Sequence, residues 1–224
     1  MSDYLKRPFI ALAVPFEFSL KTGHLRSTFS RRSQDARGAP LPWYTYPAIH
    51  FLEGINFSSA RVLEFGGGQS TLWWAERATK LLTIEEDPRW SDWLAEKTSG
   101  LNHVECVLRE NLQDYADYPA GQEFDVVIID GGDRYLCSQT ALKVVRAEGL
   151  ILLDNAEGFW GQEGTYPVID LLQESGYSRI DFYGYAPGVR WMHCTSAFFR
   201  GRCRFIFDLG PPRRDPLART EKES

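Results

Sequence analysis

The chain has 224 residues, a formal net charge of −5 and 43% hydrophobic residues, which is enough apolar sequence for one compact domain with a substantial core. It has no long basic run, which argues against nucleic acid as the main partner. No segment approaches the roughly 20 apolar residues of a membrane span, and the four cysteines show no Cys-x-x-Cys spacing. We therefore expect a reduced, cytoplasmic protein that does not act at a membrane.

Residues 1–42 are predicted to form an N-terminal arm or lid. Several arginines stand among serines between positions 26 and 37, and Gly38 and Pro40 follow them. This composition is typical of exposed chain. A solvated loop is therefore the simpler interpretation, and a binding arm is the alternative. At the other end, the charged and proline-containing residues 211–224 predict a disordered tail.

Short apolar runs recur at regular spacing in the middle of the chain. Five of them have the continuous apolar character of parallel strands that are covered on both faces: 62–65, 81–84, 104–108, 126–129 and 150–153. Two later runs, 180–185 and 194–200, flank a Pro187-Gly188 turn and predict an antiparallel hairpin. Five strand–helix units followed by an antiparallel hairpin predict an α/β, Rossmann-like fold. We expect a seven-stranded, mostly parallel sheet with a terminal antiparallel hairpin and helices on both faces, and right-handed crossovers favour this topology.

Helical patterns separate these runs. A helix is expected from Tyr46, with proline in its first turn, and the clearest one follows Asp87, a good N-cap. Trp90 and Trp93 fall on one apolar stripe of this second helix, so both are predicted in the core. Two further helices are expected over 136–145 and 168–172.

A glycine-rich turn and a carboxylate form the most informative pair in the sequence. Gly66, Gly67 and Gly68 directly follow the first predicted strand and precede a helix, and Glu85 ends the next strand. Glycines let a ligand approach the backbone, and the free N–H groups of the helix face that ligand. An acid at the position of Glu85 can accept hydrogen bonds from both ribose hydroxyls. This layout indicates a site for a nucleotide-type cofactor.

Two residues favour S-adenosylmethionine over a dinucleotide. Thr71 stands where the last glycine of a dinucleotide fingerprint is expected. Glu64 would oppose a pyrophosphate but attract the amino group of a methionine moiety. Over roughly residues 60–200 the chain resembles the class I S-adenosylmethionine-dependent methyltransferases, and we assign 43–210 to this domain. The resemblance implies a cofactor site at Glu64, Gly66, Gly67, Gly68, Ser70, Glu85, Glu86, Asn111 and Asp130. It also places Trp43 or Tyr44 near adenosine, although packing is the simpler role for both.

Acidic residues end four of the predicted strands. Glu64, Glu85, Asp130 and Asp154 should converge, because the ligand crevice of an open α/β sheet lies beyond the carboxyl ends of its strands. Each acid also has a structural alternative, since Asp130 and Asp154 precede turn residues. The convergence of all four predicts a functional cleft.

Residues 124–136 and 150–155 resemble the metal-dependent O-methyltransferases of the catechol and caffeoyl-coenzyme A type. That resemblance implies a magnesium site made of Asp130, Asp154 and Asn155, which would ease deprotonation of a bound hydroxyl. The family's basic lysine is missing, because Gly131-Gly132 fills a gap that is one residue shorter. Three alternatives stay open: Asp130 or Asp133 acts as the base, metal activation suffices, or the mechanism differs.

The sequence thus predicts O-methylation of a small hydroxylated metabolite, phenolic or sugar-derived, with S-adenosylmethionine and a possible magnesium ion. Late aromatic residues are candidates for walls of the acceptor pocket: Phe159, Trp160, Tyr166, Tyr183, Tyr185 and Trp191. A nicotinamide-dependent oxidoreductase and a non-catalytic module that keeps the fold are the alternatives. The expected partner is a small-molecule acceptor, with neither nucleic acid nor membrane, and a homodimer is a further possibility.

Overall fold

The computed structural model describes residues 2–158 and 165–211, with side chains described from residue 11 onward. Apart from Pro211, the tail predicted over 211–224 lies outside the described residues, as do Phe159 and Trp160. None of the helices in these ranges is long and apolar enough to cross a bilayer.

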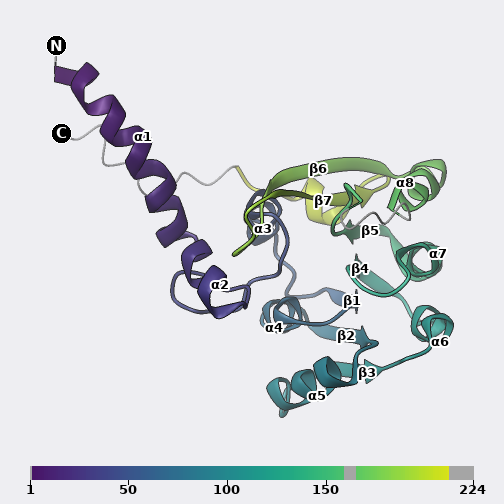
Figure 1. Ribbon diagram of the computed structural model, residues 1–224. Coiled ribbons are helices and arrows are strands. Elements are labelled where there is room, and N and C mark those ends of the chain that lie inside the picture. The colour runs from purple at the N-terminus through teal and green to yellow at the C-terminus, as the bar shows by residue number, and fades with distance from the viewer. Residues whose placement is uncertain (1, 159–164, 212–224) are drawn as a thin grey trace.

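Seven strands form one sheet in the order β3-β2-β1-β4-β5-β7-β6 (Figure 1). Their bounds are β1 Arg61–Phe65, β2 Lys80–Glu85, β3 Val104–Leu108, β4 Phe124–Ile129, β5 Val145–Leu153, β6 Ser178–Tyr185 and β7 Met192–Phe199. Strands β1 to β5 run parallel, while β7 pairs antiparallel with both β5 and β6. The predicted fold class and the terminal hairpin are therefore confirmed, with β7 inserted between β5 and β6.

Helices cover both faces of the sheet (Figure 1). Their bounds are α3 Tyr46–Glu53, α4 Gln69–Ala75, α5 Pro88–Lys97, α6 Leu112–Asp117, α7 Arg134–Val144, α8 Thr165–Glu174 and α9 Arg204–Phe207. Side chains alternate along each strand, so Val62 packs in the cluster under α3, α4 and α9, whereas Leu63 packs in the cluster under α6, α7 and α8. The short helices α6 and α9 are the elements of this domain that the apolar pattern did not indicate.

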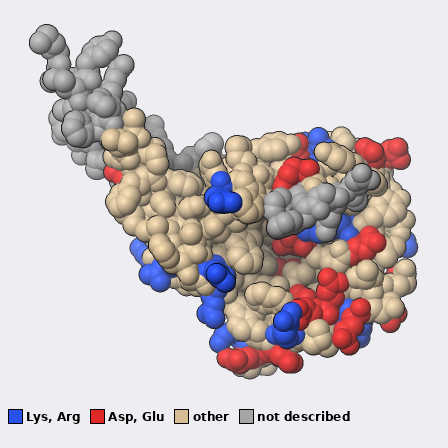
Figure 2. Space-filling model, viewed as in Figure 1, with Lys and Arg blue, Asp and Glu red and all other residues tan. Residues whose placement is uncertain are grey.

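The N-terminal segment contains two helices in place of the expected solvated loop. Helix α1 (Ser2–Lys21) projects from the body, and α2 (His24–Ser30) turns back toward it (Figure 1). From residue 11 onward most of the visible surface of α1 is uncharged, whereas Lys, Arg, Asp and Glu side chains are frequent on the sheet domain (Figure 2).

Contacts with the β6–β7 turn hold the segment after α1 in place. Trp43 Nε1 donates a hydrogen bond to the Pro187 carbonyl at 2.9 Å, and Gly188 N–H donates to His24 Nδ1 at 3.3 Å. Ser33 is fully buried and donates to the Pro42 carbonyl at 3.0 Å. These tertiary bonds fix residues 24–43 against the sheet domain.

Candidate active site

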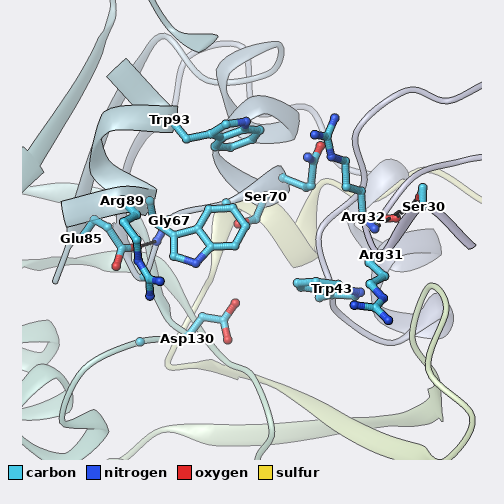
Figure 3. Close-up of a pocket in the computed structure, with 15 residues that line it drawn as sticks. Ser30, Arg31, Arg32, Trp43, Gly67, Ser70, Glu85, Arg89, Trp93 and Asp130 are labelled. Atoms are coloured by element: carbon cyan, nitrogen blue, oxygen red, sulfur yellow. Dashed lines mark hydrogen bonds between the residues drawn. The ribbon is translucent and has the colours of Figure 1, made fainter. Parts of the chain in front are cut away.

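A cavity of about 740 Å³ opens at the carboxyl ends of β1, β2 and β4. That volume lies within the usual range for small-molecule sites. Its lining comes from four parts of the chain: Gly66 to Ser70, Glu85 with Arg89, Trp90 and Trp93, Asp130 with Gly131, and finally Ser30, Arg31, Arg32 and Trp43. Figure 3 shows the N-terminal residues on the side of the cavity opposite Glu85.

The three glycines of the β1–α4 turn serve three different needs. Gly66 has a φ of 91°, and a Cβ there would lie 2.7 Å from the Gly131 nitrogen, so two backbones meet at this point. A Cβ at Gly67 would collide with Leu94 and Thr83, whereas one at Gly68 would meet nothing within 4 Å. All three were expected to admit a ligand to the backbone. All three line the cavity, but only Gly68 has room for a Cβ, since Gly66 and Gly67 are also packed against neighbouring residues.

Glu85 is held by three backbone N–H groups. Gly67 N–H donates to Oε2 at 2.8 Å, and the N–H groups of Glu86 and Asp87 donate to Oε1 at 2.8 and 2.9 Å. A carboxylate has about four lone-pair sites, so these bonds leave one position, on Oε2, for a ligand hydroxyl. The expected pair of ribose bonds is therefore reduced to one unless the Gly67 bond is exchanged.

Glu64 lies fully buried behind the glycine turn and is not part of the cavity lining. Its Oε2 accepts hydrogen bonds from the hydroxyls of Thr71 at 2.6 Å and Thr83 at 2.8 Å. Thr71 Oγ1 also accepts the Gly68 N–H at 3.0 Å, so the residue that departs from the dinucleotide pattern ties the turn to Glu64. Burial raises the pKa of Glu64 to about 7, while hydrogen bonds from neighbouring hydroxyls lower it.

Two tryptophans of α5 line the cavity instead of the core. Trp90 is 43% exposed, and its ring meets that of Trp93 edge-on at 5.5 Å between centroids. The prediction of two core residues was therefore wrong: Leu94 is the residue that α5 buries fully. On the other side, Trp43 also lines the cavity, whereas Tyr44 is fully buried and bonded to Trp74.

Asp130 follows β4 and lines the cavity beside Arg134, the first residue of α7. The guanidinium Nη2 lies 3.6 Å from Asp130 Oδ1, 3.0 Å from the Asp130 carbonyl oxygen and 3.3 Å from Asn155 Oδ1. Burial raises the pKa of Asp130, the Arg134 charge lowers it, and Glu64 and Glu85 raise it further. Of the four acids predicted to converge, Glu85 and Asp130 line the cavity, whereas Glu64 and Asp154 are buried outside its lining.

Asp154 is buried and bonded within the fold. Thr195 Oγ1 donates to Asp154 Oδ1 at 2.6 Å and accepts the Thr45 N–H at 3.1 Å, which links β5 through β7 to the start of α3. Burial and the neighbouring Asp130 raise the pKa of Asp154 well above its ordinary value.

The residues expected to bind magnesium therefore do not fit a divalent cation. Asp130 and Asn155 both face the Arg134 guanidinium, which already supplies a positive charge at this position. The third member, Asp154, bonds to Thr195. Within residues 2–158 and 165–211, no group of three or more His, Cys, Asp and Glu side chains could hold a metal ion.

Other predicted site residues lie at the edge of the site or outside it. Ser70 lines the cavity, as expected. Asn111 and Asp133 are helix N-caps that accept backbone N–H bonds at the starts of α6 and α7, and neither lines the cavity. Glu86 is exposed and borders a shallow depression beside it. The side chains of Asn111 and Asp133 thus stabilise helix starts instead of lining the cavity.

The late aromatic residues do not wall this cavity. Their described members, Tyr166, Tyr183, Tyr185 and Trp191, are between 41% and 60% exposed and absent from its lining. Arg31 and Arg32 do line it, and the sequence analysis assigned neither a role at the site. The sequence does show that residues 26–37 are rich in arginine, but composition alone cannot tell which of these arginines reach the cavity.

Residues 63–156 match the family model described as a methyltransferase domain. No curated protein sequence matches the chain. The fold itself is widespread among solved structures.

Three solved structures illustrate the likeness. A Klebsiella pneumoniae protein provisionally described as an O-methyltransferase is 23% identical, with 63% of this chain and 74% of that chain covered and a TM-score of 0.54. A Staphylococcus aureus protein provisionally described as a caffeoyl-CoA O-methyltransferase is 13% identical, with 89% and 100% covered and a TM-score of 0.53. Aeropyrum pernix fibrillarin, which binds S-adenosylmethionine natively, is 13% identical, with 62% and 66% covered and a TM-score of 0.50. At these identities the likeness establishes the fold.

Proposed function

We propose that this chain, whose residues 63–156 form a class I S-adenosylmethionine-dependent methyltransferase domain, methylates a hydroxyl oxygen of a small phenolic or sugar-derived metabolite. One observation carries the proposal. The glycine turn and Glu85 meet through a 2.8 Å hydrogen bond at the wall of a cavity that also reaches Asp130. The proposed cofactor and acceptor positions thus share one cavity, as methyl transfer requires.

The proposed cofactor position follows from the hydrogen-bond acceptors and the free space that line the cavity near the glycine turn. Glu85 Oε2 can accept one ribose hydroxyl, and the space beside Gly68 admits the ligand to the backbone. Trp90 and Trp93 offer ring faces and edges to adenine. Ser70 and the N–H groups at the start of α4 suit the methionine carboxylate. Glu64, which was expected to bind the amino group, lies behind the turn and outside the cavity lining.

Asp130 is the proposed general base. It lines the cavity, and burial raises its pKa to about 7 against the opposing charge of Arg134, which suits a proton acceptor near neutral pH. The Arg134 guanidinium, 3.6 Å away, orients the carboxylate. Bound S-adenosylmethionine supplies an electrophilic methyl group on a positively charged sulfur. Asp130 would accept the proton of the acceptor hydroxyl as its oxygen bonds to that methyl carbon and the carbon–sulfur bond breaks. Asp133, which caps α7, has no part in this scheme.

The proposed reaction does not use a divalent metal. Arg134 places a fixed positive charge against Asp130 and Asn155, where the resemblance implied magnesium. A cavity of about 740 Å³ and the net charge of −5 favour a small-molecule acceptor over nucleic acid. The homodimer and the cytoplasmic location stay predictions.

Calorimetry with S-adenosylhomocysteine tests the cofactor assignment. We expect the native protein to bind it, and Glu85→Ala to lose about tenfold or more in affinity because a charged hydrogen-bond acceptor disappears. Since Glu85 also bonds three backbone N–H groups, thermal melting must show that the variant is folded. Glu110→Ala removes the same charge from an exposed position outside the cavity and should bind normally. Equal affinity of both folded variants would refute the assignment.

A further inference from the structure

We infer that the methyl acceptor carries an anionic group, a carboxylate or a phosphate, which Arg31 and Arg32 bind. This inference rests on the proposed function, because it names the acceptor of the same site. Both arginines line the cavity, on the side opposite Glu85 (Figure 3). Guanidinium groups bind carboxylates and phosphates through paired, charge-assisted hydrogen bonds.

Neither guanidinium is used by the fold. Within residues 2–158 and 165–211, no carboxylate forms an ion pair with Arg31 or Arg32. Arg89, the third arginine of the lining, differs because it pairs with Asp87 at 2.8 Å. The cavity thus has two positive charges without a described ion pair on its N-terminal side, Glu85 on the opposite side, and Asp130 between Glu85 and Trp43 (Figure 3).

The backbone at Arg31 adopts an unfavourable conformation. Arg31 caps the C-terminus of α2 with a φ of 54°, a left-handed conformation that is uncommon for a residue with a side chain. Such strain persists only where surrounding bonds impose it. Here the Arg31 N–H bonds the Ser27 carbonyl at 2.9 Å, and buried Ser33 anchors the following turn.

The carboxylate of the cofactor is not the group that we expect Arg31 and Arg32 to bind. In the proposed docking that group meets Ser70 and the N–H groups of α4 at the glycine end of the cavity. The acceptor instead needs its hydroxyl at Asp130, which leaves its remaining substituents facing the N-terminal wall. An anionic substituent there would meet the guanidinium group of Arg31 beside Trp43, or that of Arg32, whose side chain leaves the same wall in the other direction (Figure 3).

Anion titration with matched probes tests this inference. With S-adenosylhomocysteine saturating and ionic strength fixed, calorimetry would follow binding of malonate in one arm and pyrophosphate in the other. We expect at least one to bind, and Arg31→Gln/Arg32→Gln to weaken it about tenfold or more. Arg32→Gln alone, which leaves the strained residue intact, should give a smaller loss. The preferred probe distinguishes a carboxylated from a phosphorylated acceptor.

Arg26→Gln/Arg37→Gln is the matched control, since it removes two charges from the same segment outside the cavity. It should bind both probes as the native protein does. Three results would overturn the inference: no binding of either anion, equal binding by both double variants, or a loss of S-adenosylhomocysteine affinity in the Arg31/Arg32 variant that reassigns the pair to the cofactor. If the native protein fails to bind S-adenosylhomocysteine, the proposed function fails separately, and titration of the protein alone still tests the arginines.

Discussion

The two walls of the cavity are built in opposite ways. The glycine wall belongs to the sheet: Gly66 and Gly131 pack backbone to backbone, and Glu64 and Glu85 are buried and hydrogen-bonded. The N-terminal wall, formed by Ser30 to Arg32 and Trp43, is exposed and basic, and side-chain hydrogen bonds tie it to the β6–β7 turn. Substitutions at the packed positions of the first wall should therefore destabilise the fold, whereas those in the second should be tolerated. This difference is what we expect if the proposed cofactor site is fixed and the proposed acceptor site can vary.

The largest effect should come from Gly66→Ala. The added Cβ would lie 2.7 Å from the Gly131 nitrogen, at a φ of 91° that alanine rarely adopts. We expect a loss of roughly 3 kcal/mol or more in the free energy of unfolding, measured by denaturant titration. A variant as stable as the native protein would show that the glycine wall is not the rigid one.

Next in size is a pH effect at Glu64. The unfolded carboxyl ionises near its ordinary pKa of 4.5, but the folded one stays protonated up to about 7. Stability should therefore fall as pH rises between these values and stay reduced above them, by roughly 3 kcal/mol for this residue. Glu64→Gln should flatten that fall in urea titrations from pH 5 to pH 8. An unchanged slope would contradict the burial cost assigned to Glu64.

Gly68→Ala separates ligand access from packing within the same turn. Its Cβ would meet nothing within 4 Å, so stability should change by less than about 0.5 kcal/mol. Because the methyl group enters the ligand's space, affinity for S-adenosylhomocysteine should fall about tenfold. Normal binding by this variant would place the cofactor elsewhere.

Trp43→Phe probes the N-terminal wall. It removes the Nε1 hydrogen bond to the Pro187 carbonyl, which should cost about 1 kcal/mol locally. Hydrogen exchange should quicken over residues 24–43 and stay unchanged in β1 and β4. Equal acceleration in the sheet would mean that the two walls unfold as one unit.

Addition or removal of magnesium should leave stability and cofactor affinity unchanged. Since Arg134 already faces Asp130 and Asn155, neither magnesium nor EDTA should shift the melting temperature or the affinity for S-adenosylhomocysteine. A clear stabilisation by magnesium that Asp130→Asn abolishes would restore the metal site.

The glycine wall could be predicted because its signals are local. Their spacing from the apolar runs of the predicted strands identifies the three glycines, Glu64 and Glu85. The N-terminal wall could not, because Trp43 and Pro187 are 144 residues apart in sequence and composition does not encode such a bond. The sequence could not show that Arg134 faces the residues expected to bind magnesium, because its contact with Asn155 is also tertiary.

A crystal structure with S-adenosylhomocysteine tests the central claim most directly. The account predicts a ribose hydroxyl within hydrogen-bond distance of Glu85 Oε2, adenine against Trp90 or Trp93, and the sulfur directed toward Asp130. A ligand bound away from the glycine turn, or a turn that stays closed by its own side chains at saturating ligand, would contradict it.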